Sequence, residues 1–471
     1  MTEAMFQKPN VKLIAYTQGK VGEYKIGPDD ICAFSAAGCR DSRSLYQIIL
    51  DAKNKLTSEE YQKEKEHYLN VSVGNAHLSV LDKANFEFSV EGLPRTVTLA
   101  LCEPHFFSHL QQSQRFTSAD KGCYFSENVK GTKLCEKTQK VLDQSFILYE
   151  QGDSSNIKME DARYILPLGT KTNISTNGSA REFLYFDIMT EQETMPPIVR
   201  DTAKLMYEEI TKVAPLISKK REKTREVLSF MPSSQLFGEC NESLNNLIEK
   251  YNRPTKPVLI DTFDLDAITK KSMHRAVKER NMNELANLKS SGYVFLFPIS
   301  LAGFHQGTRQ RTWDHTVETA YDAVQRVAEY DNPTGPNDFS KYSLKHRVPP
   351  QLLHNEYGLD SYNQQTNKMF DLYDEWLDEG EPKQEAVNVL PHNLIIYDRV
   401  KIDMWNMIHS FRQRLCTTAQ WEIRRITEQM LDEAIKKSPE YVSDILEEYI
   451  GTRCEIDKVC FESKPCAKFK A

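Results

Sequence analysis

Several arginines stand next to segments that should be buried. Arg163 opens the apolar stretch YILPL, and Arg414 lies about one turn before the helical pattern AQWEI. Arg309 and Arg311 follow an apolar run at 294–304. A buried guanidinium is costly unless it meets an anion or a polar group, and its planar fork matches two phosphate oxygens at once. Each arginine alone is typical of a surface or salt-bridging residue, but together they indicate an anion site.

Other kinds of chemical site find little support in the sequence. It contains no GxGxxG or GxxxxGK[ST] phosphate loop, and no HExxH or GxSxG motif. His105 and His109 are four residues apart but have no third ligand nearby. Cys454, Cys460 and Cys466 are compatible with a metal or cluster site, and also with free thiols in a weakly ordered tail. Because a fourth ligand and CxxC spacing are missing, we predict no metal site.

The size and charge of the chain limit the class of protein. Its 471 residues exceed the roughly 250–300 that one hydrophobic core organises, so we expect two or three domains. A net charge of −7 argues against a nucleic-acid polymer as partner, but not against a small phosphorylated ligand. No secretory signal and no run of about 18 apolar residues is visible, so we predict no membrane segment. Ten scattered cysteines fit a reducing compartment, and we predict a cytoplasmic protein.

The two halves of the sequence repeat one order of elements. The matching segments are 84–92, 105–116, 161–175 and 181–215 in the first half, and 294–304, 305–327, 385–398 and 401–439 in the second. Alternating polarity predicts a strand at 84–92, and the apolar run 294–304 predicts a core strand. The helical pattern of 181–215 breaks at Pro196-Pro197, and the last helical segment predicts an apolar stripe of Trp421, Ile423, Ile426, Met430 and Ala434. The second half also carries a polar insertion at 330–365, whose role the sequence does not indicate. Prolines interrupt the pattern near 251–257. We therefore predict a duplicated chain with units at 1–250 and 258–471; two unrelated α+β domains are the alternative.

Five stretches carry a family resemblance. LCTTAQWEIRR (415–425), preceded by FRQR, resembles a helix of the flavin-dependent thymidylate synthases. GNAHLSVLDKANFEF (74–88) is similar to their G-H-x-[ST] element, and SHLQQSQRF (108–116) to the end of their signature, an Arg-His-Arg triplet followed by Ser-x-Arg. DARYILP and EAVNVLP both resemble their A-R-x-x-L-P element. The resemblance implies an α+β fold of two tandem family units, each a small sheet flanked by helices, which form an intrachain pseudo-dimer.

The departures from the family pattern are sorted between the halves. In the first half the upstream glutamine, the triplet and the later arginine fall on Ala100, Glu103-Pro104-His105 and Thr190. In the second half those positions are kept as Gln306, Arg309-Gln310-Arg311 and Arg414, but the Ser-x-Arg pair falls on Thr319 and Tyr321, and the A-R-x-x-L-P arginine on Val387. Random decay would not sort the losses in this way. We infer one complete composite pocket between the two halves.

The resemblance implies a pocket for deoxyuridylate. Its substrate residues would be Gln111, Ser113, Arg115 and Arg163 from the first half, and Gln306, Arg309 and Arg414 from the second. Gln111 stands where the family has a carboxylate, and both glutamines could read the uracil edge. Ser113 would contact the phosphate or the pyrimidine. Negative charge that develops on the ring oxygens would be stabilised by Arg163 or Arg414, so these three residues are the expected catalytic groups.

The resemblance also implies a flavin site. Its residues would be His77, Ser79, Arg181, Arg309, Arg311 and His409, with Gln310 in place of the histidine of the triplet. FAD would be the cofactor, and NADPH and methylenetetrahydrofolate the co-substrates.

We expect a thymidylate synthase that methylates dUMP, with a homodimer as its assembly. The replacements at Gln111 and Gln310 leave two alternatives open: an enzyme that modifies C5 of another uridylate, and an inactive nucleotide-binding protein.

Overall fold

The computed structural model describes residues 5–119, 122–154, 157–227, 234–328, 345–354, 356–462 and 465–466. Residues 330–344 of the polar insertion therefore lie outside the described part. The chain forms two compact units. Unit 1 consists of Met1–Leu142, Pro167–Gly238 and Asp371–Leu390, and unit 2 of Asp143–Leu166, Glu239–Phe370 and Pro391–Ala471. Each unit combines segments from both halves of the sequence. The division of the sequence at 1–250 and 258–471 remains a prediction.

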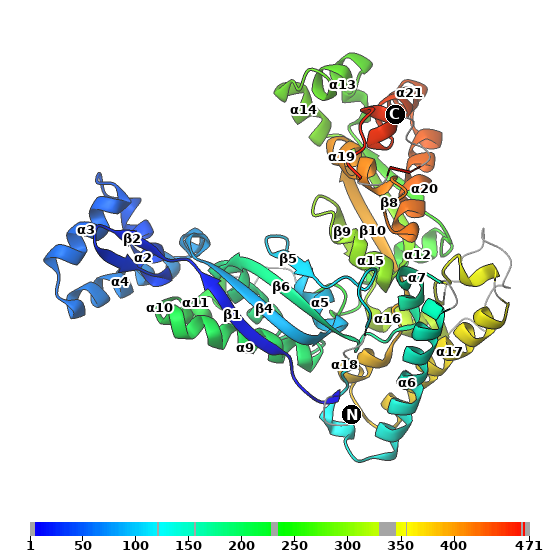
Figure 1. The fold of residues 1–471 in the computed structure, drawn as a ribbon. Coiled ribbons are helices and arrows are strands. Elements are labelled where there is room, and N and C mark those ends of the chain that lie inside the picture. Colours follow the sequence, from blue (N-terminus) through cyan, green and yellow to red (C-terminus); the bar gives the residue numbers. More distant parts are fainter. Residues whose placement is uncertain are drawn as a thin grey trace. The chain divides into compact units, whose positions relative to one another are not determined.

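The core of unit 1 is a four-stranded antiparallel sheet with the order β1-β4-β6-β5 (Figure 1). Its strands are β1 (Asn10–Tyr16), β4 (Asn85–Pro94), β5 (Ser108–Gln111) and β6 (Lys171–Ser179). The side chains of Phe86, Phe88 and Val90 are buried and alternate with more exposed ones, which confirms the strand predicted at 84–92. The hairpin β2 (Gly19–Val21) and β3 (Tyr24–Ile26) forms a separate small sheet.

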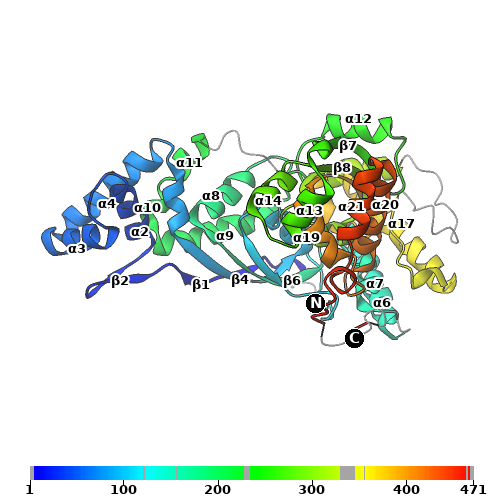
Figure 2. The ribbon, with the colours of Figure 1, turned by 90° about the horizontal axis from the view of Figure 1, so that it is seen from above.

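Helices of unit 1 pack against its sheet. α8 and α9 pack together beside the sheet, and α9 contacts β1 (Figure 2). Residues 190–196 separate them, and α9 begins at Pro197, so the break predicted at Pro196-Pro197 is confirmed. The described helices are α2 (Pro28–Gly38), α3 (Leu45–Lys55), α4 (Ser58–Val73), α5 (Arg95–Leu101), α8 (Ala180–Met189), α9 (Pro197–Val213), α10 (Pro215–Ser218), α11 (Arg221–Val227) and α18 (Lys383–Ala386), with 3-10 helices η1 (Leu78–Lys83), η2 (Glu127–Val129) and η6 (Val387–Val389).

Unit 2 is built on a second four-stranded antiparallel sheet with the order β7-β8-β10-β9. Its strands are β7 (Val258–Phe263), β8 (Gly292–Ser300), β9 (Asp314–Val317) and β10 (Ile395–Asp403). Every residue of β8 is buried, as expected for a central strand covered on both faces. In both sheets the first, second, fourth and third strands in chain order are neighbours, so the repeat predicted from the sequence has a structural counterpart.

The helices of unit 2 include the pair that follows β10. α20 contacts β7 and β8. Of the apolar stripe expected from the sequence, Ile423, Ile426, Met430 and Ala434 are buried and Trp421 is half-buried. The described helices are α7 (Met159–Ala162), α12 (Glu242–Lys250), α13 (Lys270–Val277), α14 (Met282–Lys289), α15 (Leu301–Gly307), α16 (Ala320–Ala328), α19 (Met404–Arg414), α20 (Trp421–Lys437), α21 (Glu440–Tyr449) and α22 (Arg453–Ile456), with 3-10 helices η3 (Arg163–Ile165), η4 (Leu265–Ala267) and η5 (Leu352–His354).

Each unit contains a segment that comes from the other half of the sequence. Helices α6 (Lys133–Ser154) and α17 (Glu356–Asp378) lead into these segments and contribute residues to both units. In unit 1, the Leu168 amide donates to the Leu390 carbonyl at 2.8 Å. In unit 2, the His392 amide donates to the Leu166 carbonyl at 2.9 Å. The chain thus passes from one unit to the other within the two A-R-x-x-L-P-like segments, DARYILP and EAVNVLP.

None of the described helices combines the length and the apolar composition that a membrane span requires.

Candidate functional site

The arginine-rich turn of the second half follows a short buried helix. The Ser300 hydroxyl accepts a hydrogen bond from the Gly303 amide at 3.0 Å and begins α15, as N-cap serines do. Gln306 lies near the end of this helix with only 3% of its surface exposed. Arg309 and Arg311 follow on the turn, and both are exposed. Residues 306–311 therefore hold two buried amides, those of Gln306 and Gln310, and two exposed cations.

Strand β9 supports the end of this helix. His315 Nδ1 lies 2.8 Å from Asp398 Oδ2 on the neighbouring strand β10. Burial opposes a charge on the ring, but the Asp398 carboxylate and a hydrogen bond to the Gly307 backbone outweigh it, so the pKa of His315 is raised. The end of α15 is thereby tied to the sheet.

Arg414 is the last residue of α19, and its guanidinium meets the arginine-rich turn. With the Gln310 amide oriented so that its oxygen faces the guanidinium, Oε1 accepts from Arg414 Nε at 2.8 Å and also from Nη2. Gln310 is 7% exposed. His409, the other residue of α19 expected at the site, is exposed. The structure thus brings the triplet and the later arginine into direct contact.

The segment DARY of the first half lies at the beginning of α20. The Tyr164 ring stacks on the Trp421 indole at 5.8 Å, and its hydroxyl accepts a hydrogen bond from the Gln420 amide. Arg163 is 3% exposed, and its Nε donates to the Glu160 carbonyl at 3.2 Å. Burial raises the pKa of the neighbouring Asp161 to about 6. Because all of these residues belong to unit 2, Arg163 shares a compact unit with Gln306, Arg309 and Arg414.

A buried carboxylate joins three of these elements. Glu422, in the first turn of α20, is 1% exposed and accepts from the Ser300 amide at 2.9 Å and from Arg347 Nε at 2.7 Å. The Tyr164 hydroxyl donates to its other oxygen at 2.8 Å. A Cβ atom at Gly303 would lie 2.6 Å from Glu422 Oε2, so only glycine permits this approach. Glu422 therefore fixes α15, α20 and the DARY segment to one another.

The other predicted substrate residues belong to unit 1. Gln111 is the last residue of β5, and the Ser113 hydroxyl accepts from the Arg115 amide at 3.2 Å in the turn that follows. Gln114, between them, is 6% exposed, and both ends of its amide are buried without a hydrogen-bond partner. A buried, unsatisfied amide is unusual and costly, and nothing in the sequence singled it out.

Of the three predicted flavin residues of the first half, two are exposed, and the third is half-buried and pairs with a carboxylate. His77 and Ser79 lie at the beginning of η1, and both are exposed. Arg181 forms an ion pair with Asp82 at 3.0 Å, and the Ser179 hydroxyl donates to the same carboxylate at 3.1 Å. Arg181 would have to share or exchange this partner to bind a phosphate.

In the first half, a carboxylate stands where the second half has the first triplet arginine. Glu103 Oε1 accepts from the Ser234 hydroxyl at 2.7 Å, and Oε2 from the Gln235 amide at 2.8 Å. Burial raises the pKa of Glu103 to about 7. Residues 234–236 thus cover this position, and the negative charge of the Glu103 carboxylate disfavours a phosphate there.

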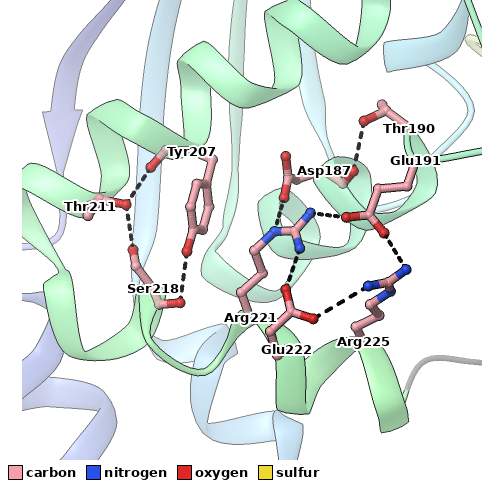
Figure 3. A network of polar contacts seen from close by, with 9 residues as sticks. All are labelled: Asp187, Thr190, Glu191, Tyr207, Thr211, Ser218, Arg221, Glu222 and Arg225. Atoms are coloured by element: carbon pink, nitrogen blue, oxygen red, sulfur yellow. Dashed lines mark hydrogen bonds and ion pairs between the residues drawn. The ribbon is translucent and has the colours of Figure 1, made fainter.

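The position of the later arginine is also occupied by an acidic network in the first half (Figure 3). The Thr190 hydroxyl donates to the Asp187 carbonyl at 2.7 Å. The carboxylates of Asp187 and Glu191 both bind Arg221. Burial raises the pKa of Asp187, while the hydrogen bond from Arg221 opposes the rise. Together with Glu103, this network leaves the first half without the anion-binding groups that the second half keeps.

The ionisation of Glu103 gives a testable pH dependence. A glutamate has a pKa near 4.5 when exposed and about 7 here, so between these values the folded chain binds more protons than the unfolded chain. Stability contributed by this group is present below about pH 4.5 and is lost as the pH rises to about 7, by up to about 3 kcal/mol. Glu103→Gln should flatten this dependence, measured as the difference in Tm between pH 5 and pH 8. Equal differences in the variant and the wild type would contradict the assignment.

Within the described ranges, no group of three or more His, Cys, Asp or Glu side chains could hold a metal ion. Cys454, Cys460 and Cys466 lie within these ranges and form no disulfide. The sequence analysis missed Gln310 as a partner of Arg414, and it missed Glu422, although both stand inside motifs that it had quoted.

Comparison with known proteins agrees with the motifs. A family model described as thymidylate synthase complementing protein matches residues 20–216 and 266–440, which together cover most of the chain in two segments. A flavin-dependent thymidylate synthase from Pyrococcus furiosus is 31% identical over 195 residues, which is 38% of this chain and 75% of the relative. One from Clostridium tetani is 26% identical over 218 residues, 42% of this chain and 84% of the relative.

Among solved structures, a UMP/dUMP methylase from Streptomyces cacaoi is 15% identical and covers 48% of this chain and 96% of its own. The TM-score of this match is 0.37. The match of the family model carries the assignment, and it confirms the family predicted from the motifs. The chain belongs to the thymidylate synthase complementing protein family.

Proposed function

We propose that this protein is a flavin-dependent thymidylate synthase that methylates dUMP at C5. One observation carries the proposal furthest: Arg163, from the first half, lies in the same compact unit as Gln306, Arg309 and Arg414. These four residues are the guanidinium and amide groups that an anionic pyrimidine nucleotide needs. Membership of the family, and relatives that bear the name of this enzyme, support the same reaction.

The proposal gives each group of unit 2 a role toward the nucleotide. Gln306 is held inside α15, so its amide can offer a donor and an acceptor to the uracil edge without losing side-chain freedom on binding. Arg309 is exposed on the turn and is suited to bind a phosphate oxygen. Arg163 and Arg414 stabilise the negative charge that develops on the ring oxygens when C5 is attacked.

The exposed cations of the turn fit a flavin phosphate. Arg309 and Arg311 are both exposed, and they flank the buried Gln310, so two guanidinium groups point outward from one turn. The proposal assigns them to FAD, together with His77, Ser79, Arg181 and His409. When bound, the reduced flavin supplies the hydride, with NADPH as its reductant and methylenetetrahydrofolate as the one-carbon donor. The protein binds and orients these groups.

Residues of unit 1 complete the proposed substrate set. We propose that Gln111, Ser113 and Arg115 act on the same nucleotide as the residues of unit 2. The losses of motif residues are sorted between the halves, and Glu103 and Thr190 stand at the first-half positions where cations are missing. One nucleotide site per chain follows.

Two measurements test the proposal. The purified protein should show flavin absorbance, either as isolated or after reconstitution with FAD. With methylenetetrahydrofolate and NADPH it should release tritium from [5-³H]dUMP, and equilibrium dialysis should find one dUMP per chain. A protein that remains colourless after reconstitution and releases no tritium would overturn the proposal.

A parallel assay distinguishes the uridylate. Release from [5-³H]UMP at a similar rate would broaden the substrate class, because the amide at Gln111 replaces the carboxylate that the family pattern has at this position. We expect dUMP to be preferred. Binding of dUMP without release from either nucleotide would indicate the inactive nucleotide-binding alternative.

A further inference from the structure

The turn between α15 and β9 is fixed on both sides of Gln310. The Gln310 amide donates to the Gly307 carbonyl at 2.8 Å, and its carbonyl accepts from the Trp313 amide at 2.9 Å. The Trp313 indole nitrogen donates to the Ser410 hydroxyl of α19 at 3.0 Å. The backbone at Gln310 therefore has a defined place beside α19, and the direction of its side chain is set by the fold.

The Gln310 side chain engages one edge of the Arg414 guanidinium. A single oxygen accepts from Nε, at 2.8 Å, and from Nη2. Because the guanidinium is planar and its five N–H groups are fixed relative to one another, two bonds on one edge determine the direction of the others. The N–H groups on Nη1 consequently face away from Gln310. This contact sets where Arg414 can present a donor to a ligand.

The chemistry of the partner matters as much as its position. A glutamine stays neutral at every pH that the protein meets, so it orients the guanidinium without cancelling its charge. A carboxylate at this position would form an ion pair and compete with an anionic ligand. A histidine could become charged below about pH 6.5 and would then repel the guanidinium. Burial at 7% exposure makes each of these differences larger than it would be in water.

We propose that Gln310 is a positioning residue that holds Arg414 for the anionic nucleotide and keeps that contact independent of pH. The inference rests on the proposed function. It accounts for the glutamine in the middle of the triplet, where the family pattern has a histidine. Gln310 does not touch the reacting atoms in this account; it acts through Arg414.

Two variants separate positioning from general stability. Gln310→Met keeps the length of the side chain but removes the acceptor. We expect the Kd for dUMP to rise about tenfold at pH 8, because Arg414 loses both hydrogen bonds that orient it. Gln310→His should bind dUMP progressively more weakly than the wild type as the pH falls from 8 to 5.5. At each pH the Kd of the variant is divided by that of the wild type. The effect of nucleotide ionisation on Kd is the same for both proteins and cancels in this ratio. For Gln310→Met that ratio should not change with pH.

A double-mutant cycle gives the decisive readout. In an Arg414→Lys background, which retains a cation but not the planar fork, adding Gln310→Met should change the Kd for dUMP less than twofold. The same tenfold loss in both backgrounds, or a ratio for Gln310→His that does not change with pH, would overturn the inference. If Gln310→Met fails to fold, the pH series of Gln310→His decides alone. If the wild-type protein binds no dUMP, the proposed function and this inference are both overturned. If the wild type binds dUMP and the variants bind it equally well, only the inference is overturned.

Discussion

Replacing Arg414 by alanine is expected to weaken dUMP binding by about two to three orders of magnitude and to abolish tritium release. Arg414 ends α19, and its guanidinium is fixed by Gln310, so its loss removes a preorganised charge and leaves the amide of Gln310 without its partner. Isothermal titration with dUMP and the tritium assay measure the two effects. A change of less than threefold in both would exclude Arg414 from the site.

The chain offers a matched control for this variant. Arg424 lies on α20 in the same unit, where it donates to the Thr417 carbonyl at 3.1 Å and lies 3.9 Å from Glu428. Arg424→Ala removes the same charge at a position without a proposed role, and the Kd of this variant for dUMP should stay within twofold of the wild type.

Arg163→Ala tests the contribution of the first half. It should resemble Arg414→Ala, and undiminished binding would refute the composite pocket.

Replacing Glu422 by alanine is expected to destabilise unit 2 by about 3–5 kcal/mol, the effect of breaking a buried ion pair. The substitution leaves the guanidinium of Arg347, 3% exposed, without its carboxylate. It also removes the acceptor of the Ser300 amide and of the Tyr164 hydroxyl, both buried. Since Trp313, Trp405 and Trp421 belong to unit 2, the fluorescence change during urea denaturation reports mainly on this unit.

The control for Glu422 lies two turns further along the same helix. Glu428 is exposed and contacts Arg424 at the limit of an ion pair, so Glu428→Ala should change the free energy of unfolding by less than about 0.5 kcal/mol. A loss of stability in Glu422→Ala no larger than that of the control would show that the buried network contributes little.

The fold could be predicted where local pattern and burial agree. The alternation in β4, the break at Pro196-Pro197 and the apolar stripe of α20 are all local signals, and each is confirmed. The boundary at Ser300 is different. The apolar run 294–304 predicts one buried strand, but the chain becomes helical after Ser300 because this serine caps α15 while burial continues unchanged. Hydrophobicity alone cannot show such a transition.

The site was predictable only as far as motifs identify single residues. The sequence indicated Arg309, Arg311 and Arg414, but not the contact between Gln310 and Arg414, because the two residues lie on different elements far apart in the chain. The role of Glu422 depends on a glycine at 303 and a serine at 300, which packing alone brings to it. Such contacts arise from tertiary structure, and no periodicity records them.

The exchange of segments between the sequence halves has a consequence for biosynthesis. Most of unit 1 has been translated by Gly238, yet the unit is complete only after Asp371–Leu390 has left the ribosome. The nascent first half must therefore wait, with the partner surface of that segment uncovered, for more than a hundred further residues. Its eventual closure is a unimolecular step, limited by closing a long loop rather than by finding another molecule, so its rate is independent of protein concentration.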